Sequence, residues 1–421
     1  MRTATPSDPV MRRIALAVDA NRMEILDLAH WIHAHPEPGF EERGASERVA
    51  GALARHGYAV ERPAGSLETA VRARLRGGAG DGPTVAILAE YDALRGLGHG
   101  CGHNLISAAG AGAAIALAAV RDELRGEIVF LGTPAEEDLA GKQVMIDDGL
   151  FEGVDAAMMI HASNQTQVEL ELLASIDARV TYAGLQAHAA TDPWSGRNAL
   201  DALLLLFQSI GLWRQQLRPD ARVHGIVVDG GSAVNIIPAQ ARGHFRFRSA
   251  DQSHHDEMAE RFRSMVEGAA LATGCTAELT FSARATTMRH NRTIGARFRE
   301  HLAAAGMADG PLSPRLGSSD IGNVSLLVPT IHPMLAMVDG PVPLHSVAFR
   351  GAAATPQADE VALVGAVCLA QTAAELLGNP ELVAAAWAEF LESDGGVQTA
   401  QLARGAGPAH AAVPPEPTHG S

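Results

Sequence analysis

The sequence predicts an α/β protein with a mostly parallel sheet, into which a second unit of strands and helices is inserted. In the first and last parts of the chain, short continuous apolar runs alternate with helical patterns, which is typical of strands covered on both faces. Between these parts, half-exposed strands and helices follow a different order. The chain of 421 residues also exceeds what one hydrophobic core usually supports, so two domains are expected.

The first part opens with a helical pattern over residues 19–57, which is interrupted at Pro36 and Pro38. The apolar runs that follow are expected to form buried strands at residues 84–90, 127–134 and 156–162. An Ala-rich helix at 108–120 lies between the first two runs, and a short helical turn ending in glycine lies between the last two. Strands that alternate with helices in this way predict a mostly parallel sheet.

The pattern changes near residue 173, where the next six segments predict the order β-α-β-β-α-β, a layer of one sheet and two helices. These segments are residues 172–184, 196–217, 222–231, 239–249, 254–274 and 275–285. From about residue 287 the first pattern resumes, with a helix, an apolar run and a last helix. The expected divisions are a first domain at 1–173 and 287–395, an inserted domain at 174–286, and a tail at 396–421. The Pro, Gly and Ala content of the tail predicts disorder.

The amino-acid composition limits which binding partners and which cellular location are expected. The 33 basic and 48 acidic residues give a formal net charge of -15, and the scattered basic residues argue against nucleic acid as a partner. The apolar runs are short and the N-terminus does not resemble a signal peptide, so we expect no membrane association and a cytoplasmic location. Three unpatterned cysteines make a disulfide framework improbable.

Polar residues follow each predicted strand, at the edge of a parallel sheet where ligands bind. They are Glu90 and Asp92, the stretch "LGHGCGHN" with Cys101 and His103, the pair Glu136 and Glu137, His161, and His345 from the resumed half. Cysteine, histidine and carboxylates at one edge form the ligand set of a transition-metal site. Adjacent acidic residues that face such a set are costly unless a cation offsets them.

Each of these residues alone has a simpler interpretation. Cys101 could be a small buried hydrophobic residue, His103 could cap the following helix, and the two glutamates could be a solvated helix start. Their convergence on one edge nevertheless favours a metal site.

The motifs "AEYDAL", "GHGCGHN", "PAEED", "IHA", "GLQAHAATDPWSGRNALDAL", "GGSAVNIIPAQA", "GSSD" and "PLHS" occur in an order that resembles the aminoacylase/carboxypeptidase family of dinuclear metallopeptidases. Within this family, the chain is most similar to the branch of aminobenzoyl-glutamate hydrolases and related dipeptidases. The resemblance implies a phosphorylase/hydrolase-like catalytic domain with an inserted ferredoxin-like dimerisation domain. It also implies hydrolysis of the amide bond of an N-acyl amino acid or dipeptide with a free carboxylate, using two divalent metal ions. Zinc is expected, with manganese or cobalt as alternatives.

The same resemblance assigns roles to individual residues. It implies that Cys101 is a bridging thiolate and that the other metal ligands are His103, Glu137, His161 and His345. Glu136 would be the general base, and Asp92 would orient a ligand histidine.

In the inserted unit, the resemblance implies that His188 reaches the active site of the partner in a homodimer and stabilises the developing oxyanion. Asn235 and Arg248 would hold the substrate carboxylate, since an amide and a guanidinium both suit that group. Gly317 lies in a loop that resembles the lining of the same carboxylate pocket. A surface strand residue is the alternative interpretation of Arg248.

Two departures from the family pattern affect the site. Glu90 stands where many carboxypeptidase-type relatives have a ligating histidine, which leaves an extra acidic ligand open. The segment "EEDLAGK" lacks the glycine run of the related branch, and Asp138 could alter the mouth of the site. His33, His99 and His332 are expected to be structural or to support ligands.

Two other functions compete with the metal-dependent hydrolase. One is an amidase in which Cys101 is a covalent nucleophile and His103 its base, although two residues on one turn are poorly placed for proton transfer. The other is a non-catalytic binding or scaffold protein, against which the presence of Glu136 argues.

Overall fold

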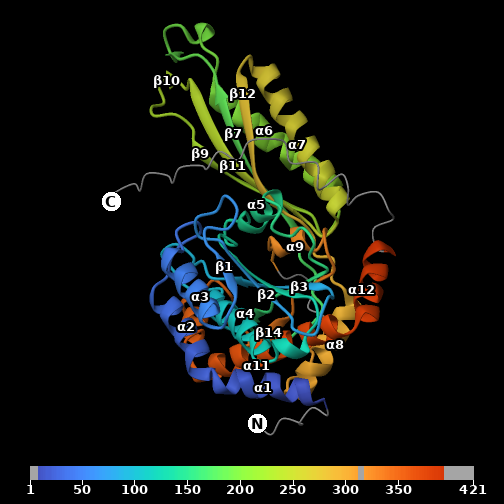
Figure 1. Cartoon of the computed structure of the whole chain (residues 1–421). Helices are drawn as coiled ribbons and strands as arrows, with labels where there is room; N and C mark the ends of the chain where they lie inside the picture. The colour runs from blue at the N-terminus through green and yellow to red at the C-terminus, as the bar shows by residue number, and fades with distance from the viewer. Residues whose placement is uncertain (1–7, 312–316, 393–421) are drawn as a thin grey trace.

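The computed structural model describes residues 8–311 and 317–392, so the predicted tail at 396–421 lies outside the described residues. Figure 1 shows an α/β unit that contains the first and last described helices, with a unit of one sheet and two helices projecting from it. The predicted fold class, a largely parallel α/β sheet with an inserted β-α-β-β-α-β unit, is confirmed.

The main sheet has six strands in the order β1-β2-β4-β3-β5-β13. Their bounds are β1 (Ala59–Glu61), β2 (Val71–Arg76), β3 (Thr84–Glu90), β4 (Glu127–Thr133), β5 (Ala156–Met158) and β13 (Thr330–Ile331). The strands β4, β3, β5 and β13 are parallel, with Val85 opposite Ile128 and Ala156. The antiparallel pair β1 and β2 at one edge was not predicted. Alternate residues of β2 are exposed or half-buried arginines, so it lacks a continuous apolar run.

Two of the predicted strands are each divided in two. Residues 156–162 form β5 and then β6 (His161–Ser163), and the apolar run near residue 330 forms β13 and then β14 (Met334–Ala336). The strands β6 and β14 pair in a small parallel sheet of their own. Between β13 and β14 lies Pro333, which has no N–H for a ladder bond and accepts one from His161 through its carbonyl. The break places His161 at the end of the main sheet.

Helices cover both faces of the main sheet. On one face lie α1 (Pro9–Ala20), α2 (Arg22–Ala34), α3 (Arg43–Arg55), α4 (His103–Ala118), α8 (Arg292–Ala304) and α11 (Pro356–Gly378), and α12 (Pro380–Glu392) packs against α8 and α11. The short α5 (Gly141–Asp147) and α9 (Ile321–Val324) contribute to a second core on the other face, and α10 (Val347–Ala352) follows His345. The 3-10 turn η1 (Arg121–Glu123) follows α4.

The helices α1 and α12 were not predicted. Proline stands at the first position of each, and the side chain of Asp8 accepts a hydrogen bond from Val10 at the start of α1. Proline at the first helical position and an aspartate N-cap are recognised signals of a helix N-terminus, so both helices were predictable from the sequence.

By length and composition alone, α11 is apolar enough to cross a membrane. However, 78% of its apolar window is buried inside the structure, where it packs against α1, α4 and α8.

The inserted unit has the predicted element order. It consists of β7 (Ala174–Ala183), α6 (Ala199–Trp213), β9 (Arg222–Asp229), β11 (Gln240–Ser249), α7 (Gln252–Thr273) and β12 (Thr276–Ala285). The sheet is antiparallel in the order β12-β7-β11-β9, and both helices pack on one of its faces around a separate hydrophobic core. A small pair, β8 (Ala187–His188) and β10 (Ile236–Ile237), and the turns η2 (Pro193–Ser195) and η3 (Arg214–Gln216) complete it. That residues 174–286 fold as an independent domain stays a prediction.

Close packing of α4 on β3 predicts opposite effects for two helical glycines. A Cβ on Gly110 would lie 2.9 Å from the Cβ of Ala89, whereas a Cβ on the exposed Gly268 of α7 would meet nothing within 4 Å. We expect Gly268→Ala to raise the free energy of unfolding by about 0.8 kcal/mol through helix propensity. Gly110→Ala should lower it by about 1 kcal/mol or more, because the strand must move. Calorimetric unfolding of both variants measures the sign, and a stabilising Gly110→Ala would contradict this account of the packing.

Candidate metal centre

The polar residues predicted to converge do converge at the carboxyl ends of the strands. Glu90 is the last residue of β3, and Asp92 follows it in the next turn. Glu136 and Glu137 come shortly after β4 ends at Thr133, and His161 begins β6. The strand ends therefore fix these side chains through the register of the sheet.

The loop with three glycines before α4 places Cys101 and His103 beside these carboxylates. Gly102 has a φ of 79°, a conformation that side chains disfavour, and a Cβ there would lie 2.8 Å from the Cβ of Ala162. The helix then begins with His103, so the tight turn directs its ring toward the strand ends. Gly100 accepts a hydrogen bond from the backbone N–H of His345, which joins the last predicted ligand to the same loop.

Asp92 contacts the His103 ring through two oxygen atoms. The Nδ1 atom of His103 lies 2.9 Å from the backbone oxygen of Asp92 and 3.0 Å from its Oδ1, and both partners can only accept. Nδ1 therefore carries the proton, which leaves Nε2 directed toward the other acids. The second oxygen of Asp92 accepts from the backbone N–H of Glu137 at 3.0 Å, so one carboxylate positions two of the predicted ligands.

Cys101 lies at the centre of the predicted ligand set. Its sulfur is 3.6 Å from Nε2 of His161, and the ligand atoms of Cys101, His103 and His161 all lie within 4.8 Å of one another. The same holds for the ligand atoms of Cys101, Glu137 and His345, in which Oε2 of Glu137 is 3.5 Å from Nε2 of His345. The sulfur thus belongs to two of three candidate groups, and the third consists of Glu90, His103 and Glu136.

The electrostatics of the cluster favour a bound cation. Buried atoms without a hydrogen-bond partner include Oε2 of Glu90, Nε2 of His103 and Oε1 of Glu137. Burial raises the pKa of Glu137 to about 7 and raises that of the Cys101 thiol, and it lowers the pKa of His161 to about 4. A cysteine sulfur packed this closely with unpartnered nitrogen and oxygen atoms is the donor set that zinc and related divalent ions bind, so the residues fit such ions.

The burial of Cys101 argues against the competing cysteine mechanism. Asp92 holds His103 through Nδ1 and leaves its Nε2 as the nitrogen that could act as a base, while the Cys101 sulfur also lies 3.6 Å from Nε2 of His161. Burial also raises the pKa of the Cys101 thiol, so the thiolate needed for attack is disfavoured without a cation.

The structure adds Lys142 and Asp320 to this region, two residues that the sequence analysis did not single out. Lys142, at the start of α5, is fully buried, and its Nζ lies 2.6 Å from Oε1 of Glu90 and 2.6 Å from Oδ1 of Asp320. Lys142 is also the only lysine in the chain, with 32 arginines making up the other basic residues. That bias was a signal available in the sequence, because a lone lysine in an arginine-rich chain stands out.

The predicted substrate-binding residues fall into two places. His188 and Asn235 lie together at the β8 and β10 pair, where the N–H of Ala189 donates to the backbone oxygen of Asn235 at 3.1 Å. Arg248 lies near the end of β11 opposite Ser175, close to where Leu173 donates to the backbone oxygen of Gly317 at 3.0 Å. Within residues 8–311 and 317–392, no hydrogen bond or ion pair joins His188 or Asn235 to the metal cluster.

The three histidines expected to be structural lie outside the triads. His33 approaches the backbone oxygen of Arg350 at 2.9 Å, and His99 is almost fully buried. His332 packs edge-on against the His161 ring at 5.5 Å between centroids, and its role stays a prediction.

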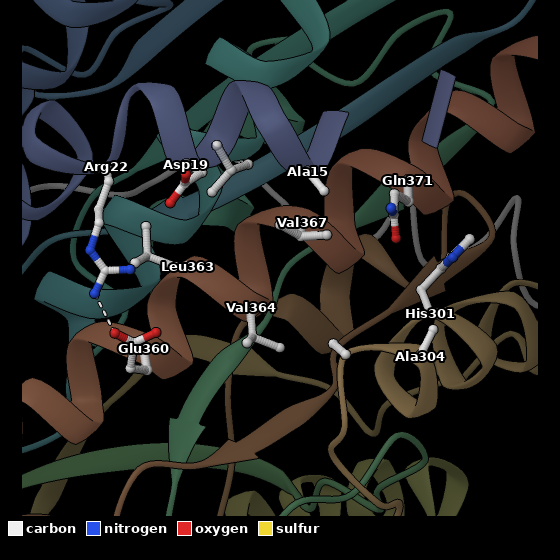
Figure 2. Close-up of a pocket in the computed structure, with 12 residues that line it drawn as sticks. Ala15, Asp19, Arg22, His301, Ala304, Glu360, Leu363, Val364, Val367 and Gln371 are labelled. Atoms are coloured by element: carbon white, nitrogen blue, oxygen red, sulfur yellow. Dashed lines mark hydrogen bonds and ion pairs between the residues drawn. The ribbon is translucent and has the colours of Figure 1, made fainter. Parts of the chain in front are cut away.

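A separate pocket of about 270 Å³ lies between α1, α8 and α11 (Figure 2). Arg22 and Glu360 form an ion pair at its edge, and Val364 and Val367 line its wall. None of its lining residues belongs to the metal cluster, so the two are distinct.

Comparison with known proteins identifies the family. The model of peptidase family M20/M25/M40 matches residues 86–385, which include most of β3, the strands β4, β5 and β13, and the inserted unit. The chain belongs to peptidase family M20/M25/M40. The resemblance drawn from the motifs is confirmed, and the chain is a hydrolase of peptide or amide bonds as a member of this family.

Two curated relatives and one solved structure illustrate the relationship. The Xaa-Arg dipeptidase of Mus musculus is 36% identical over 411 residues, covering 92% of this chain and 94% of that protein. A component chain of the p-aminobenzoyl-glutamate hydrolase of Escherichia coli strain K12 is 35% identical over 306 residues, covering 68% of this chain and 63% of that protein. The crystal structure of a dinuclear metal-binding M20 peptidase from Bacillus subtilis superposes with a TM-score of 0.64 at 22% identity, covering 85% of this chain and 99% of that one.

The burial of Lys142 predicts its chemical reactivity. An amine-directed acylating reagent should leave Lys142 unmodified in the native protein, because its ammonium is enclosed and paired with two carboxylates. The same reagent should modify it fully after denaturation. Mass spectrometry of the peptide that contains Lys142 measures both states, with the denatured sample as the control. Rapid labelling of Lys142 in the native protein would show that the ion-pair cluster is open to solvent.

Proposed function

We propose that this M20 hydrolase cleaves the amide bond of an N-acyl amino acid or dipeptide that carries a free carboxylate, with Glu136 as the general base. The observation that carries this proposal is the pair of ligand triads sharing Cys101, with Glu136 beside them. In the proposal, two divalent ions, zinc or alternatively manganese or cobalt, are held by Cys101, His103, Glu137, His161 and His345. When bound, such ions would lower the pKa of a water molecule and polarise the scissile carbonyl.

Glu136 is placed to move the proton in this reaction. Its Oε2 is 3.7 Å from Nε2 of His103, and its side chain is buried at the edge of the cluster. Burial, and then the nearby Glu90, raise the pKa of Glu136 well above its ordinary value. A carboxylate of raised pKa takes a proton from the attacking water more readily and then delivers it to the leaving amine.

Arg248 is the proposed partner of the substrate carboxylate. In the described part of the chain its Nε is buried without a hydrogen-bond partner, and burial, followed by the nearby Arg246, lowers the pKa of its guanidinium. An anion beside it would relieve both conditions, and the planar fork matches a carboxylate. Gly317 belongs to the loop near the same end of the inserted sheet and is proposed to line the carboxylate pocket.

His188 and Asn235 are proposed to act across a homodimer. Both lie at the β8 and β10 pair, and Figure 1 shows β10 at the end of the inserted unit far from the main sheet. A second copy of the chain that brings this region to the cluster would complete the site. Carboxylate binding by Asn235 and oxyanion stabilisation by His188 both depend on that arrangement.

The edge of the inserted sheet supports the dimer. Among the described residues β9 is the outermost strand of its sheet and no strand pairs with one side of its backbone, where Ile226, Val227 and Val228 are all exposed. Leu212 on the neighbouring α6 is 69% exposed. An unpaired apolar edge strand is a natural site for pairing with a second copy of itself.

The names of the relatives support peptide and acyl-amino-acid substrates. The mouse relative is named as a dipeptidase, and the Escherichia coli relative is named for hydrolysis of an aminobenzoyl amino acid. We accordingly propose dipeptides and N-acyl amino acids as the first substrates to examine.

One experiment tests the proposed function. Metal-free protein is supplied with zinc, manganese or cobalt and assayed on dipeptides, aminobenzoyl-glutamate and β-alanyl dipeptides, each with a free or an amidated C-terminal carboxylate. Hydrolysis should require the metal and the free carboxylate. Glu136→Gln should retain its bound metal but lose hydrolysis by a factor of about 100 to 10,000.

The metal content of Glu136→Gln is the control for this experiment. A variant that keeps both ions and full activity would contradict the role of Glu136. Equal cleavage of amidated substrates would contradict the carboxylate requirement.

The dimer has its own test. Ile226→Asp should lower the dimer fraction at a given concentration, because it places a charge in the proposed β9 contact. Leu271→Asp is the matched control, since Leu271 is 86% exposed on α7, away from this edge. Analytical ultracentrifugation measures the distribution of masses. A dimer of unchanged affinity in Ile226→Asp would place the interface elsewhere.

A further inference from the structure

We propose that Glu90 is an additional metal ligand and that Lys142 is the positioning residue that leaves one oxygen of Glu90 free for the ion. This inference rests on the proposed metal-dependent function and adds Glu90, which the sequence left open as an extra acidic ligand, to the five ligands proposed above. It concerns the carboxylate that ends β3, which stands beside the His103 ring.

Lys142 contacts one carboxylate oxygen of Glu90 and leaves the other available to bind an ion. Its Nζ lies 2.6 Å from Oε1, which fixes that oxygen, whereas Oε2 is buried and has no hydrogen-bond partner within residues 8–311 and 317–392. The other carboxylate on Lys142 is used differently, because Asp320 accepts from Nζ through Oδ1 and from the backbone N–H of Lys142 through Oδ2 at 2.8 Å. Asp320 thus has no free oxygen, and Glu90 has one.

Lys142 alone does not neutralise both of its carboxylate partners, and the next basic group beside Glu90 is the His103 ring, whose Nε2 lies 3.5 Å from Oε2. One ammonium faces two carboxylates, and the side chains of Glu90, Lys142 and Asp320 are all fully buried. A buried carboxylate that lacks full compensation is strongly destabilising. A further cation near the free oxygen of Glu90 would remove the excess negative charge.

The distances around His103 show where that cation would lie. Nε2 of His103 is 3.5 Å from Oε2 of Glu90 and 3.7 Å from Oε2 of Glu136. These separations are too long for good hydrogen bonds. Two atoms that each bind one ion at about 2.1 Å with tetrahedral geometry lie about 3.4 Å apart, so the spacing of Glu90 and His103 suits ligands of a shared ion.

The choice of lysine fits this role. The chain uses arginine at every other basic position, yet the residue between Glu90 and Asp320 is its only lysine. A compact ammonium can contact one oxygen of each carboxylate, whereas a guanidinium tends to take both oxygens of one carboxylate. Arginine here would therefore compete with the ion for Oε2 of Glu90.

Two matched variants separate ligation from charge balance. Glu90→Gln and Asp320→Asn each neutralise one carboxylate on Lys142, but only Glu90 has an oxygen free for an ion. Metal-free samples of both variants and the wild type are titrated with Zn²⁺ against a chromophoric chelator. The measured quantities are the number of ions bound per chain and the dissociation constant of each.

We expect the wild type to bind two ions and Glu90→Gln to bind one of them at least about tenfold more weakly. Asp320→Asn should change neither constant by more than about threefold. With Co²⁺ as the probe, the visible absorption spectrum should change in Glu90→Gln and stay that of the wild type in Asp320→Asn. Thermal unfolding of the metal-free proteins checks folding, and Glu90→Asp, which keeps the charge but shortens the reach, replaces Glu90→Gln if that variant does not fold.

Wild-type affinity for both ions in Glu90→Gln would overturn the inference, and so would equal weakening in the two variants, since Glu90 would then only balance Lys142. A wild-type protein that binds no ion at all would instead contradict the proposed function itself. The two failures are therefore distinguishable without an activity assay.

Discussion

The concentration of buried negative charge at the carboxyl ends of β3 and β4 is the constraint on which the rest of the structure depends. Glu90, Asp92, Glu136 and Glu137 lie within a few residues of two adjacent strand ends, and all but Glu137 are fully or almost fully buried. Such a group is stable only if cations compensate it. The chain supplies Lys142 as one of them, and the remaining unpaired oxygens face a histidine and a cysteine that are suited to divalent ions.

Much of the fold and of the metal cluster was predictable, because local patterns determine both. The continuous apolar runs gave the parallel strands, and the polar residues after them had to meet at one edge once those strands were parallel. The antiparallel β2 escaped prediction because its alternate arginines interrupt the apolar run. The breaks after β5 and β13 depend on how two strands pair across the sheet, which no single segment of the sequence reveals.

The role of Lys142 could not be derived from spacing alone. It stands more than fifty residues from Glu90 and far more from Asp320, so only the folded chain brings the three together. The sequence did contain a hint in the scarcity of lysine. The same limit applies to His188 and Asn235, whose mutual proximity is local while their relation to the cluster depends on a second copy of the chain in the proposal.

The chain enters the inserted unit through β7 and leaves it through β12, and these two strands are neighbours because Ser175 near the start of β7 lies opposite Ala285 at the end of β12. Its two connections are therefore side by side, and no strand of the six-stranded sheet has to shift to accommodate it. The inserted unit is therefore attached to the α/β unit at a single place. A short turn that joined Ser175 directly to Ala285 would remove most of the inserted unit, reconnect the two parts of the α/β unit and leave the strand order of the main sheet unchanged.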